Sequence, residues 1–501
     1  MIRSETLLEH LIARDARASS ELQEWAARGP TLLVGNEAIP ASRLQEVEDP
    51  STASVVCEAP IATPNEIDDA VAVAFEASSQ WENLGSFKRY EILLRAADHI
   101  ERHAYDFALL DAIDSGNPLS AMENDVILGL RHLRYFSAMG LAIRGDTFAT
   151  AATGLHYSLR EPYGVVARIV PFNHPAMFAI GKLAPPLIAG NTVVLKPAQQ
   201  TPLSALYLAT LLRDLLPSGV VTFLPGDAET GSALVRHSRI KRVTFMGGVA
   251  TGQRVQADAA SVGIKAVTLE LGGKNPMLVF PDADLDRAVV GCVAGMNLNV
   301  CQGQSCGSNS RILIHKSIFD PFMEALSDAL RGIQVGVAYA TSTQMGPVID
   351  RRHFDRVSAY IDRGRDEARL VAGGGHPAGA PEEGYFIEPT LFEVEGKEEI
   401  ANHEIFGPVI TAMSWEDEEQ AVQIANDVPY GLTASVWTQD IARVNRIVRQ
   451  LDAGYVWVNE HGMHYLGAPF GGFKSSGIGE EESVSEIESF LQTKSVHVAE
   501  A

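Results

Sequence analysis

The stretch from about residue 163 to residue 273 constrains the fold most strongly, because short β-rich runs alternate there with helical runs such as 202–216 and 251–260. Near-continuous apolar strands separated by helices predict a parallel sheet covered by helices on both faces. The predicted strands cover residues 165–170, 192–195, 220–224, 242–246 and 266–269. Ligands of such sheets bind beyond the carboxyl ends of the strands, so the residues that follow each run are the candidates for a functional site.

The rest of the chain predicts a second α/β region between residues 274 and 475. It contains a strand at 311–315, a helix at 318–330 and a strand–helix pattern at 409–426. Helical spacing of apolar residues also occurs at 66–82, 87–102 and 122–135. Because 501 residues exceed one core of ordinary size, we expect two or three domains.

Charge and cysteine content indicate the environment and exclude some partners. The chain has 40 basic and 63 acidic side chains, a net charge of −23, so we expect neither nucleic acid nor an anionic membrane as a partner. Four cysteines are too few for a disulfide framework at this length, which favours a reducing compartment. Glu5, Glu9 and Asp15 interrupt the first apolar residues, so the sequence predicts no signal or transit peptide and a cytoplasmic protein. No apolar run approaches the roughly 20 residues that span a bilayer.

Two of the predicted strands end in residues suited to phosphate or ribose. Gly247 and Gly248 follow the fourth strand and open a helix that also contains Gly252. Glycines let the backbone approach a phosphate, and a helix N-terminus supplies unpaired N–H donors. Lys196 ends the second strand, where its ammonium group can bind ribose hydroxyls or a phosphate. A tight turn and a solvated surface lysine are the ordinary alternatives.

Three further motifs carry groups for acyl chemistry. Asn173, between two prolines, can donate an amide N–H to a developing oxyanion, or can cap the next helix. Glu270 precedes paired glycines, where it can act as a general base or form a structural ion pair. Cys306 lies in a glycine-containing loop open to a carbonyl, but its thiol needs activation from an unshifted pKa of about 8.5. Cys292 and Cys301 are interpreted as buried and inert, and no Cys/His cluster has the spacing of a metal site.

These motifs together resemble the aldehyde dehydrogenase superfamily from about residue 45 to residue 498. The matching segments are 171–175, 196–198, 247–252, 270–276, 303–306, 404–408 and 469–472. The resemblance implies an aldehyde dehydrogenase-like α/β fold of two Rossmann-related parallel-sheet domains with a small oligomerisation element, assembled as a homodimer or homotetramer. It places a cofactor-binding domain at 1–139 and 163–273, a catalytic domain at 274–475, and the oligomerisation element at 140–162 and 476–501.

The resemblance also implies NAD or NADP as the cofactor, an aldehyde as the small-molecule substrate and a carboxylic acid as the product. Cys306 is then the nucleophile, Glu270 the base, and Asn173 the oxyanion donor together with the Cys306 backbone N–H. The cofactor is expected to contact Phe172, Lys196, Gln199, Gly247, Gly248, Gly252, Glu404 and Phe406. The expected walls of the substrate pocket are His174, Met177, Phe178, Gly181, Met463, His464, Tyr465 and Phe470.

Four positions depart from the family pattern. Gln199 stands where a glutamate often binds both ribose hydroxyls of NAD and repels the 2′-phosphate of NADP, so we expect NADP to be tolerated or preferred. Gly248 replaces a usual Ser or Thr, and Glu480 replaces a basic residue of an interface ion pair. Gly181 stands where a large aromatic is frequent, which predicts a roomier pocket for a medium-to-bulky aromatic or aliphatic aldehyde and argues against a cation–π cage for a quaternary amine.

Two rival functions remain at this point. A CoA-acylating dehydrogenase passes the acyl group to a thiol, but such relatives typically lack the base found here as Glu270. A non-catalytic structural or binding protein on the same fold is the second rival, because a fold alone does not fix a function. The presence of Cys306, Glu270 and Asn173 together favours a hydrolytic enzyme.

Overall fold

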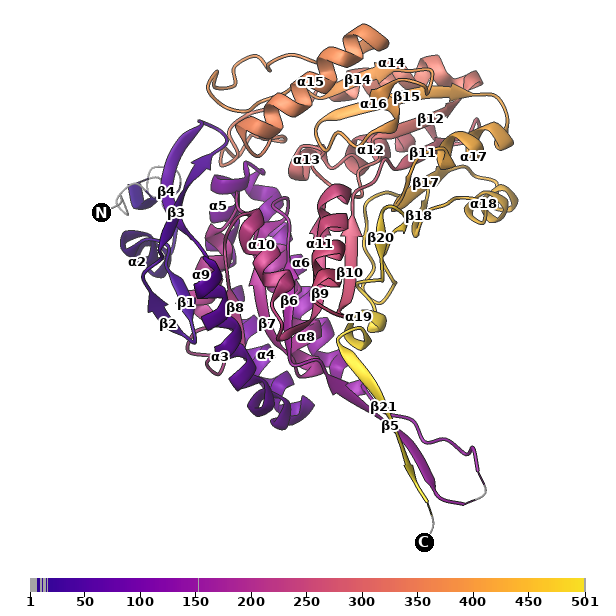
Figure 1. Cartoon of the computed structure of the whole chain (residues 1–501). Helices are drawn as coiled ribbons and strands as arrows, with labels where there is room; N and C mark the ends of the chain where they lie inside the picture. The colour runs from indigo at the N-terminus through magenta and orange to yellow at the C-terminus, as the bar shows by residue number, and fades with distance from the viewer. Residues whose placement is uncertain (1–6, 10, 12–14, 16, 152, 500–501) are drawn as a thin grey trace.

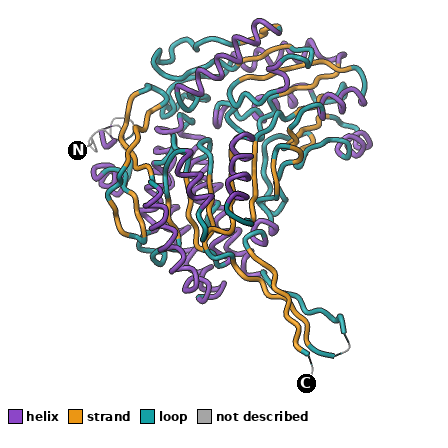
Figure 2. Tube along the Cα trace, viewed as in Figure 1, coloured by secondary structure: helices purple, strands orange, loops and turns teal. Residues whose placement is uncertain are grey.

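Two large sheets, each covered by helices on both faces, form the body of the protein (Figure 1). The computed structural model describes residues 7–9, 11, 15, 17–151 and 153–499. A two-stranded arm projects away from the body (Figures 1 and 2). The architecture has the parallel sheets and flanking helices that the alternating pattern predicts.

The first sheet has six strands, of which all but the edge strand β20 run parallel. Val165 and Ala167 pack into a core on one face, whereas Val166 packs into a second core on the other, as the alternation of side chains along a strand requires. In order across the sheet the strands are β20 (Gly477–Ile478), β10 (Ala266–Leu271), β9 (Ile240–Gly247), β6 (Val165–Ile169), β7 (Thr192–Lys196) and β8 (Val221–Phe223).

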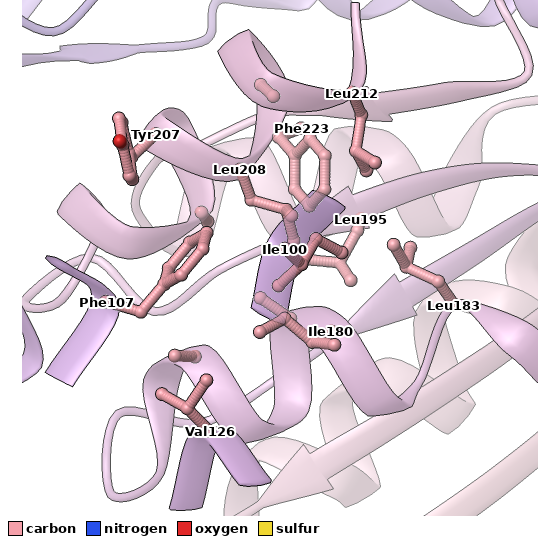
Figure 3. Close-up of a cluster of buried hydrophobic side chains, with 14 of the residues drawn as sticks. Ile100, Phe107, Val126, Ile180, Leu183, Leu195, Tyr207, Leu208, Leu212 and Phe223 are labelled. Atoms are coloured by element: carbon pink, nitrogen blue, oxygen red, sulfur yellow. The ribbon is translucent and has the colours of Figure 1, made fainter. Parts of the chain in front are cut away.

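Helices from before and between these strands cover both faces. Helices α3 (Pro64–Asn83), α10 (Ala228–Arg236) and α11 (Val249–Ser261) contribute to the core on one face. The other face carries α4 (Gly85–Glu101), α5 (Ala104–Ser115), α6 (Leu119–Met139), α7 (Pro175–Gly181), α8 (Ala184–Ala189) and α9 (Leu203–Leu212), joined by α2 (Ser20–Arg28). Figure 3 shows part of this core, where Phe107, Ile180 and Phe223 converge from a helix, a second helix and a strand.

Local sequence signals account for the helix boundaries. Helix α3 begins with a capping box in which the Glu66 carboxylate accepts from the Thr63 backbone N–H at 2.7 Å, and Pro64 occupies the first turn. Asp227 caps α10 by accepting from the backbone N–H groups of Glu229 and Thr230. These caps satisfy donors that a helix start would otherwise leave unpaired.

The second sheet has seven strands and is parallel except for its edge pair β13–β14. Its strands, in order, are β13 (Arg369–Ala372), β14 (Thr390–Glu393), β15 (Val409–Trp415), β12 (Arg311–His315), β11 (Pro276–Val279), β17 (Thr433–Trp437) and β18 (Tyr455–Val458). One face packs on α12 (Leu285–Gly295) and α14 (Phe319–Arg331), and the other on α15 (Arg351–Glu367), α16 (Glu399–Asn402), α17 (Glu418–Asn426) and α18 (Ile441–Val448). The short α13 (Leu298–Cys301) follows α12.

Four two-stranded sheets complete the structure, and one of them is the arm. The arm consists of β5 (Leu155–Pro162) and β21 (Leu491–Val498), which pair antiparallel over their full length. The other pairs are β1 (Leu32–Val34) with β2 (Glu37–Ile39), β3 (Arg43–Asp49) with β4 (Ser54–Ile61), and β16 (Tyr430–Gly431) with β19 (Phe473–Lys474). The segment 476–501, which the sequence analysis assigns to one element, is divided: β20 extends the six-stranded sheet, and β21 forms the arm beyond α19 (Val484–Glu488).

Candidate active site

Asn173 lies in the turn between β6 and α7. Pro175 occupies the first turn of α7, where a missing backbone N–H costs nothing. The Asn173 residue is 3% exposed, and its side-chain Oδ1 has no hydrogen-bond partner within the described part of the chain. Its backbone carbonyl accepts a hydrogen bond from Asn117 Nδ2 at 2.9 Å. Asn117 therefore fixes the turn through its backbone and leaves the Asn173 side-chain amide available for another group.

Cys306 lies in a loop whose backbone requires glycine. Gln302 and Gly303 both have positive φ angles, 55° and 73°, and a Cβ at Gly303 would overlap the Gly407 carbonyl oxygen. Cys306 is partly exposed, whereas the other three cysteines are buried. His174 Nε2 lies 3.9 Å from Cys301 Sγ, so the loop of the nucleophile candidate contacts the turn that holds Asn173.

Asn275 anchors the Cys306 loop, and sequence reasoning did not single it out. Its Nδ2 donates to the backbone carbonyls of Cys306 at 2.7 Å and Ser308 at 2.9 Å. Its Oδ1 accepts from the backbone N–H of Thr433 at 3.1 Å. The only sequence signal was its place in the segment 270–276, five residues after Glu270. One side chain thus connects the turn after β10, the Cys306 loop and β17.

Glu270 lies near the end of β10, 7% exposed, and neither carboxylate oxygen has a hydrogen-bond partner among the described residues. Burial raises the pKa of Glu270 well above its usual range, and the charge of Glu481 raises it further. A buried carboxyl group without partners is costly in the folded protein, and its usual justification is a functional one.

Cys306 and Glu270 influence each other's ionisation. Burial, with the charges of Glu270 and Glu404, raises the pKa of the Cys306 thiol to about 12, although the backbone N–H of Gly307 opposes this effect. The thiol is therefore protonated at neutral pH and becomes nucleophilic when a base removes its proton. Glu270, whose charge acts on the Cys306 thiol, is the candidate for that base when it is ionised.

Glu404 contacts the paired glycines that follow Glu270, and the aromatic ring of Phe406 comes two residues later in the chain. The Glu404 carboxylate accepts from the Gly273 backbone N–H at 3.1 Å, and a Cβ at Gly272 would overlap that carboxylate. Phe406 has a positive φ of 59° and packs edge-on against Phe172 with 5.9 Å between ring centroids. His353, which sequence reasoning missed, donates from Nε2 to the Phe406 carbonyl at 2.6 Å and holds this strained backbone in place.

The residues expected to hold a dinucleotide lie at one edge of the six-stranded sheet. Lys196 ends β7 and is 6% exposed, and the one hydrogen bond that its side-chain Nζ makes with the described residues is to the Pro197 carbonyl, at 3.1 Å. Burial lowers the pKa of Lys196 to about 8. Gln199 is exposed nearby, and its backbone carbonyl accepts from Gln45. Gly247 ends β9, and Gly248 starts α11 without a side-chain cap.

Gly252 has a packing role in the same helix. A Cβ at Gly252 would lie 2.6 Å from Leu271 Cδ2, so the missing side chain lets α11 approach β10. Gly248, in contrast, has open space around its Cα. The N-terminus of α11 therefore presents its backbone N–H groups at the end of the sheet where Lys196 also ends its strand.

The expected substrate-pocket residues come from two segments. His174, Met177, Phe178 and Gly181 belong to α7 or its start, and Met463, His464, Tyr465 and Phe470 belong to the loop after β18. His174 Nδ1 contacts Asp125 Oδ2 at 2.6 Å, and although burial opposes it, the Asp125 charge raises the pKa of His174 well above its usual range. Met463 and Tyr465 are exposed, Phe470 is buried, and Tyr465 donates to Glu460 at 2.7 Å.

Gly181 does not simply enlarge the pocket. A Cβ at this position would lie 3.1 Å from the Cβ of His132, a buried residue of α6. The absence of a side chain lets α6 and α7 approach each other, and His132 fills the adjacent space. Burial lowers the pKa of His132 to about 4, so this histidine is neutral near pH 7. The missing side chain of Gly181 thus serves the packing of α7 on α6, and the roomier pocket stays a prediction.

Comparison with known proteins decides the family. The model described as "Aldehyde dehydrogenase family" matches residues 39–496. The chain belongs to the aldehyde dehydrogenase family. It is 42% identical over 464 residues to aldehyde dehydrogenase tropH of Talaromyces stipitatus, covering 91% of this chain and 90% of that protein. It is 37% identical to the putative aldehyde dehydrogenase DhaS of Bacillus subtilis, covering 90% and 92%. The solved NAD+ complex of a Bacillus cereus aldehyde dehydrogenase superposes with a TM-score of 0.90 at 35% identity, covering 94% and 96%.

This aldehyde dehydrogenase also contains a buried ionic cluster next to Glu270, which sequence reasoning missed. Arg168 Nη2 contacts Glu481 Oε1 at 2.9 Å and Glu486 Oε1 at 3.0 Å, and Lys182 Nζ contacts Glu481 Oε2 at 2.6 Å. All four residues are less than 4% exposed. The acidic run 480–482 was the only hint of this cluster in the sequence. Glu480 of this run is exposed, whereas Glu481 is buried.

Within the described ranges, no three His, Cys, Asp or Glu side chains are grouped so that they could hold a metal ion. The helices there are also too short or too polar to cross a membrane.

Proposed function

We propose that this enzyme oxidises an aldehyde to the carboxylic acid with NAD or NADP, through acyl intermediates on Cys306. The observation that carries the proposal is a partly exposed Cys306 whose thiol feels the charge of Glu270, a buried carboxyl group with no hydrogen-bond partner among the described residues. A nucleophile and a base in one electrostatic environment are the requirement for forming and hydrolysing a thioester. The contact between His174 and Cys301 brings the Asn173 turn to the same loop.

In this mechanism Cys306, as the thiolate, adds to the carbonyl carbon of the aldehyde. The resulting oxyanion receives hydrogen bonds from the Asn173 amide and the Cys306 backbone N–H. NAD(P)+, held by Lys196, the start of α11, Glu404 and Phe406, would supply the hydride acceptor, and Cys306 would then carry the acyl group as a thioester. Glu270 then takes a proton from a water molecule that attacks the thioester, and the acid leaves as the Cys306 sulfur is released.

The residues present fit a dinucleotide. The ammonium group of Lys196 donates no hydrogen bond to another side chain among the described residues, so it is available for ribose hydroxyls. The uncapped start of α11 at Gly248 offers backbone donors to a pyrophosphate. Glu404, held by Gly273, is available for the second ribose, and Phe406 for the nicotinamide ring. Titrating the apoprotein with NAD+ and NADP+ by calorimetry tests this assignment separately from turnover.

The pH dependence of turnover tests the role of Glu270. Because its pKa is raised well above the usual range, the basic carboxylate form appears only as the pH rises, so activity is expected to increase with pH through that ionisation. Glu270→Gln is expected to lower kcat by about 10²–10⁴-fold and to remove this limb from the profile. The control is Glu480→Gln, an exposed carboxylate of the late segment. Wild-type kcat in Glu270→Gln would exclude Glu270 as the base.

Gln199 is expected to govern the choice between NAD and NADP. A neutral amide does not repel a 2′-phosphate, whereas a carboxylate at this exposed position would. Gln199→Glu is therefore expected to shift the ratio of kcat/KM for NAD over NADP by at least about tenfold toward NAD. Gln200→Ala serves as the neighbouring control. A wild-type preference for NAD of a hundredfold or more would contradict the interpretation of Gln199.

We further infer a cytoplasmic homodimer or homotetramer that acts on medium-to-bulky aromatic or aliphatic aldehydes. Following the resemblance, we divide the chain into a cofactor-binding part, a catalytic part and an oligomerisation arm. The arm supports assembly because Leu155, Leu159 and Val498 are exposed on it. Light scattering measures the oligomeric state. Product analysis, acid against acyl-CoA, distinguishes hydrolysis from transfer to a thiol.

A further inference from the structure

His464 is held in one orientation by three aromatic rings and one carboxylate. Its ring packs on Phe470 with 4.6 Å between centroids, lies parallel to Tyr455 within 16° at 6.0 Å, and contacts Trp457 at 6.2 Å. Nδ1 lies 2.9 Å from both carboxylate oxygens of Glu482. A histidine fixed on all these sides is a preorganised group rather than a surface residue in motion.

The other ring nitrogen of His464 is left without a partner. Burial opposes ionisation of Glu482, but the charge and hydrogen bond of His464 lower the pKa of that carboxyl group to about 2. The ionised carboxylate requires a hydrogen on Nδ1. Nε2 makes no hydrogen bond to any described residue, and 35% of the His464 side chain is exposed. Nε2 is therefore the atom that can bind a ligand.

Contacts of the neighbouring residues place His464 beside α6 and α7. A Cβ on Gly467, in the same loop, would lie 2.9 Å from the hydroxyl oxygen of Tyr135 in α6. Glu481, next in the chain to the carboxylate that holds His464, contacts Lys182 Nζ at the end of α7 at 2.6 Å. The loop of His464 therefore lies against α6 and near the end of α7, the helix that carries expected pocket walls.

The charges around His464 favour a neutral ligand group. Glu482 places a carboxylate at Nδ1, and the cations of the adjoining ionic cluster, Arg168 and Lys182, are already paired with Glu481 and Glu486. A second anion would be repelled by these carboxylates. A hydroxyl group both donates and accepts a hydrogen bond, so it suits Nε2 whether or not that nitrogen carries a hydrogen.

We propose that Nε2 of His464 binds a hydroxyl group on the ring of an aromatic aldehyde, which makes hydroxylated aromatic aldehydes the preferred substrate class. The exposed apolar side chain of Met463, next to His464 on the same loop, provides a surface for the ring, and the buried Phe470 supports the imidazole from its other side. This inference rests on the proposed function, because it names the substrate of that same site. It assigns to His464 a role in specificity, not in the chemical steps.

The test compares kcat/KM for benzaldehyde with kcat/KM for the three hydroxybenzaldehydes. The corresponding methoxybenzaldehydes and carboxybenzaldehydes are measured beside them. In the wild type, the best hydroxy isomer is expected to exceed benzaldehyde by about tenfold or more, and to exceed the methoxy and carboxy compounds. His464→Phe keeps the ring packing but removes the polar nitrogen, so the ratio of the hydroxy isomer over benzaldehyde is expected to fall to about one. His461→Phe, in the same loop, is the matched control and should keep the ratio.

A second variant separates the loss of this hydrogen bond from a loss of correctly folded enzyme. His464→Gln retains a hydrogen-bonding group and is expected to recover part of the hydroxyl preference, whereas a purely structural loss would lower both substrates equally. Retention of the full preference in His464→Phe, or a wild-type preference for carboxybenzaldehydes, would overturn the inference while aldehyde oxidation itself stood. If no aldehyde were oxidised at all, the proposed function would fail and this inference with it.

Discussion

Cys306→Ala is expected to abolish aldehyde oxidation, with kcat/KM lower by at least about 10⁴-fold. Removing the nucleophile of a covalent mechanism leaves only binding and oxyanion stabilisation, and in other enzymes such a removal costs several orders of magnitude. The alanine variant should still bind NAD+ or NADP+, because the thiol makes no hydrogen bond with the residues expected to hold the dinucleotide. Initial rates at the reduced-nicotinamide absorbance band, together with calorimetric titration of the cofactor, measure both quantities.

Cys292→Ala is the matched control for the loss of a thiol. Cys292 lies fully buried in α12, packs in the core on one face of the seven-stranded sheet, and is absent from every contact of the site. Its replacement should change kcat/KM by less than about threefold, since it removes one buried sulfur from a core that does not touch the reacting groups. Substantial turnover by Cys306→Ala would mean that another group carries the acyl intermediate, and the mechanism would have to be abandoned.

Much of the six-stranded sheet could be predicted because its strands are buried on both faces. Such strands read as short apolar runs, so the predicted strand at 192–195 corresponds to β7, Thr192–Lys196. In the second sheet the strand expected at 311–315 is β12 with the same bounds. The strand-end rule then directed attention to Asn173, Lys196 and Glu270, which the structure places at or near the ends of β6, β7 and β10.

The anchoring contacts of the site could not be predicted, because they join segments far apart in the sequence. Asn275 connects Cys306 to Thr433, and no spacing rule relates these positions. The two-residue strand β20 is too short for periodicity to predict, yet it pairs with Leu269 and Glu270 and so covers the edge of the strand that carries the proposed base. The close packing of Gly181 could not be predicted for the same reason, since the neighbour it approaches, His132, belongs to another helix.

The buried ion pairs also join segments far apart in the sequence and could not be predicted. Removing one of them is expected to cause the largest loss of stability. Arg168 is 1% exposed and contacts Glu481 and Glu486, more than 300 positions later in the chain. Arg168→Met would leave Glu481 and Glu486 to share Lys182 as their one remaining ion-pair partner among the described residues, at 2.6 Å and 3.9 Å. We expect the free energy of unfolding, measured by urea titration, to fall by about 3–5 kcal/mol.

Arg134→Met is the control for Arg168→Met, because it removes an ion pair that is exposed instead of buried. Arg134 also contacts two carboxylates, Asp98 and Glu101, but these lie largely in solvent, and its own side chain is 34% exposed. Water stabilises the separated charges of such a pair, so its loss should cost less than about 1 kcal/mol. If Arg168→Met cost no more than Arg134→Met, the buried carboxylates would have to be protonated in the folded enzyme. Their negative charge would then no longer explain the raised pKa of Glu270, and the pH profile of turnover would shift toward acid.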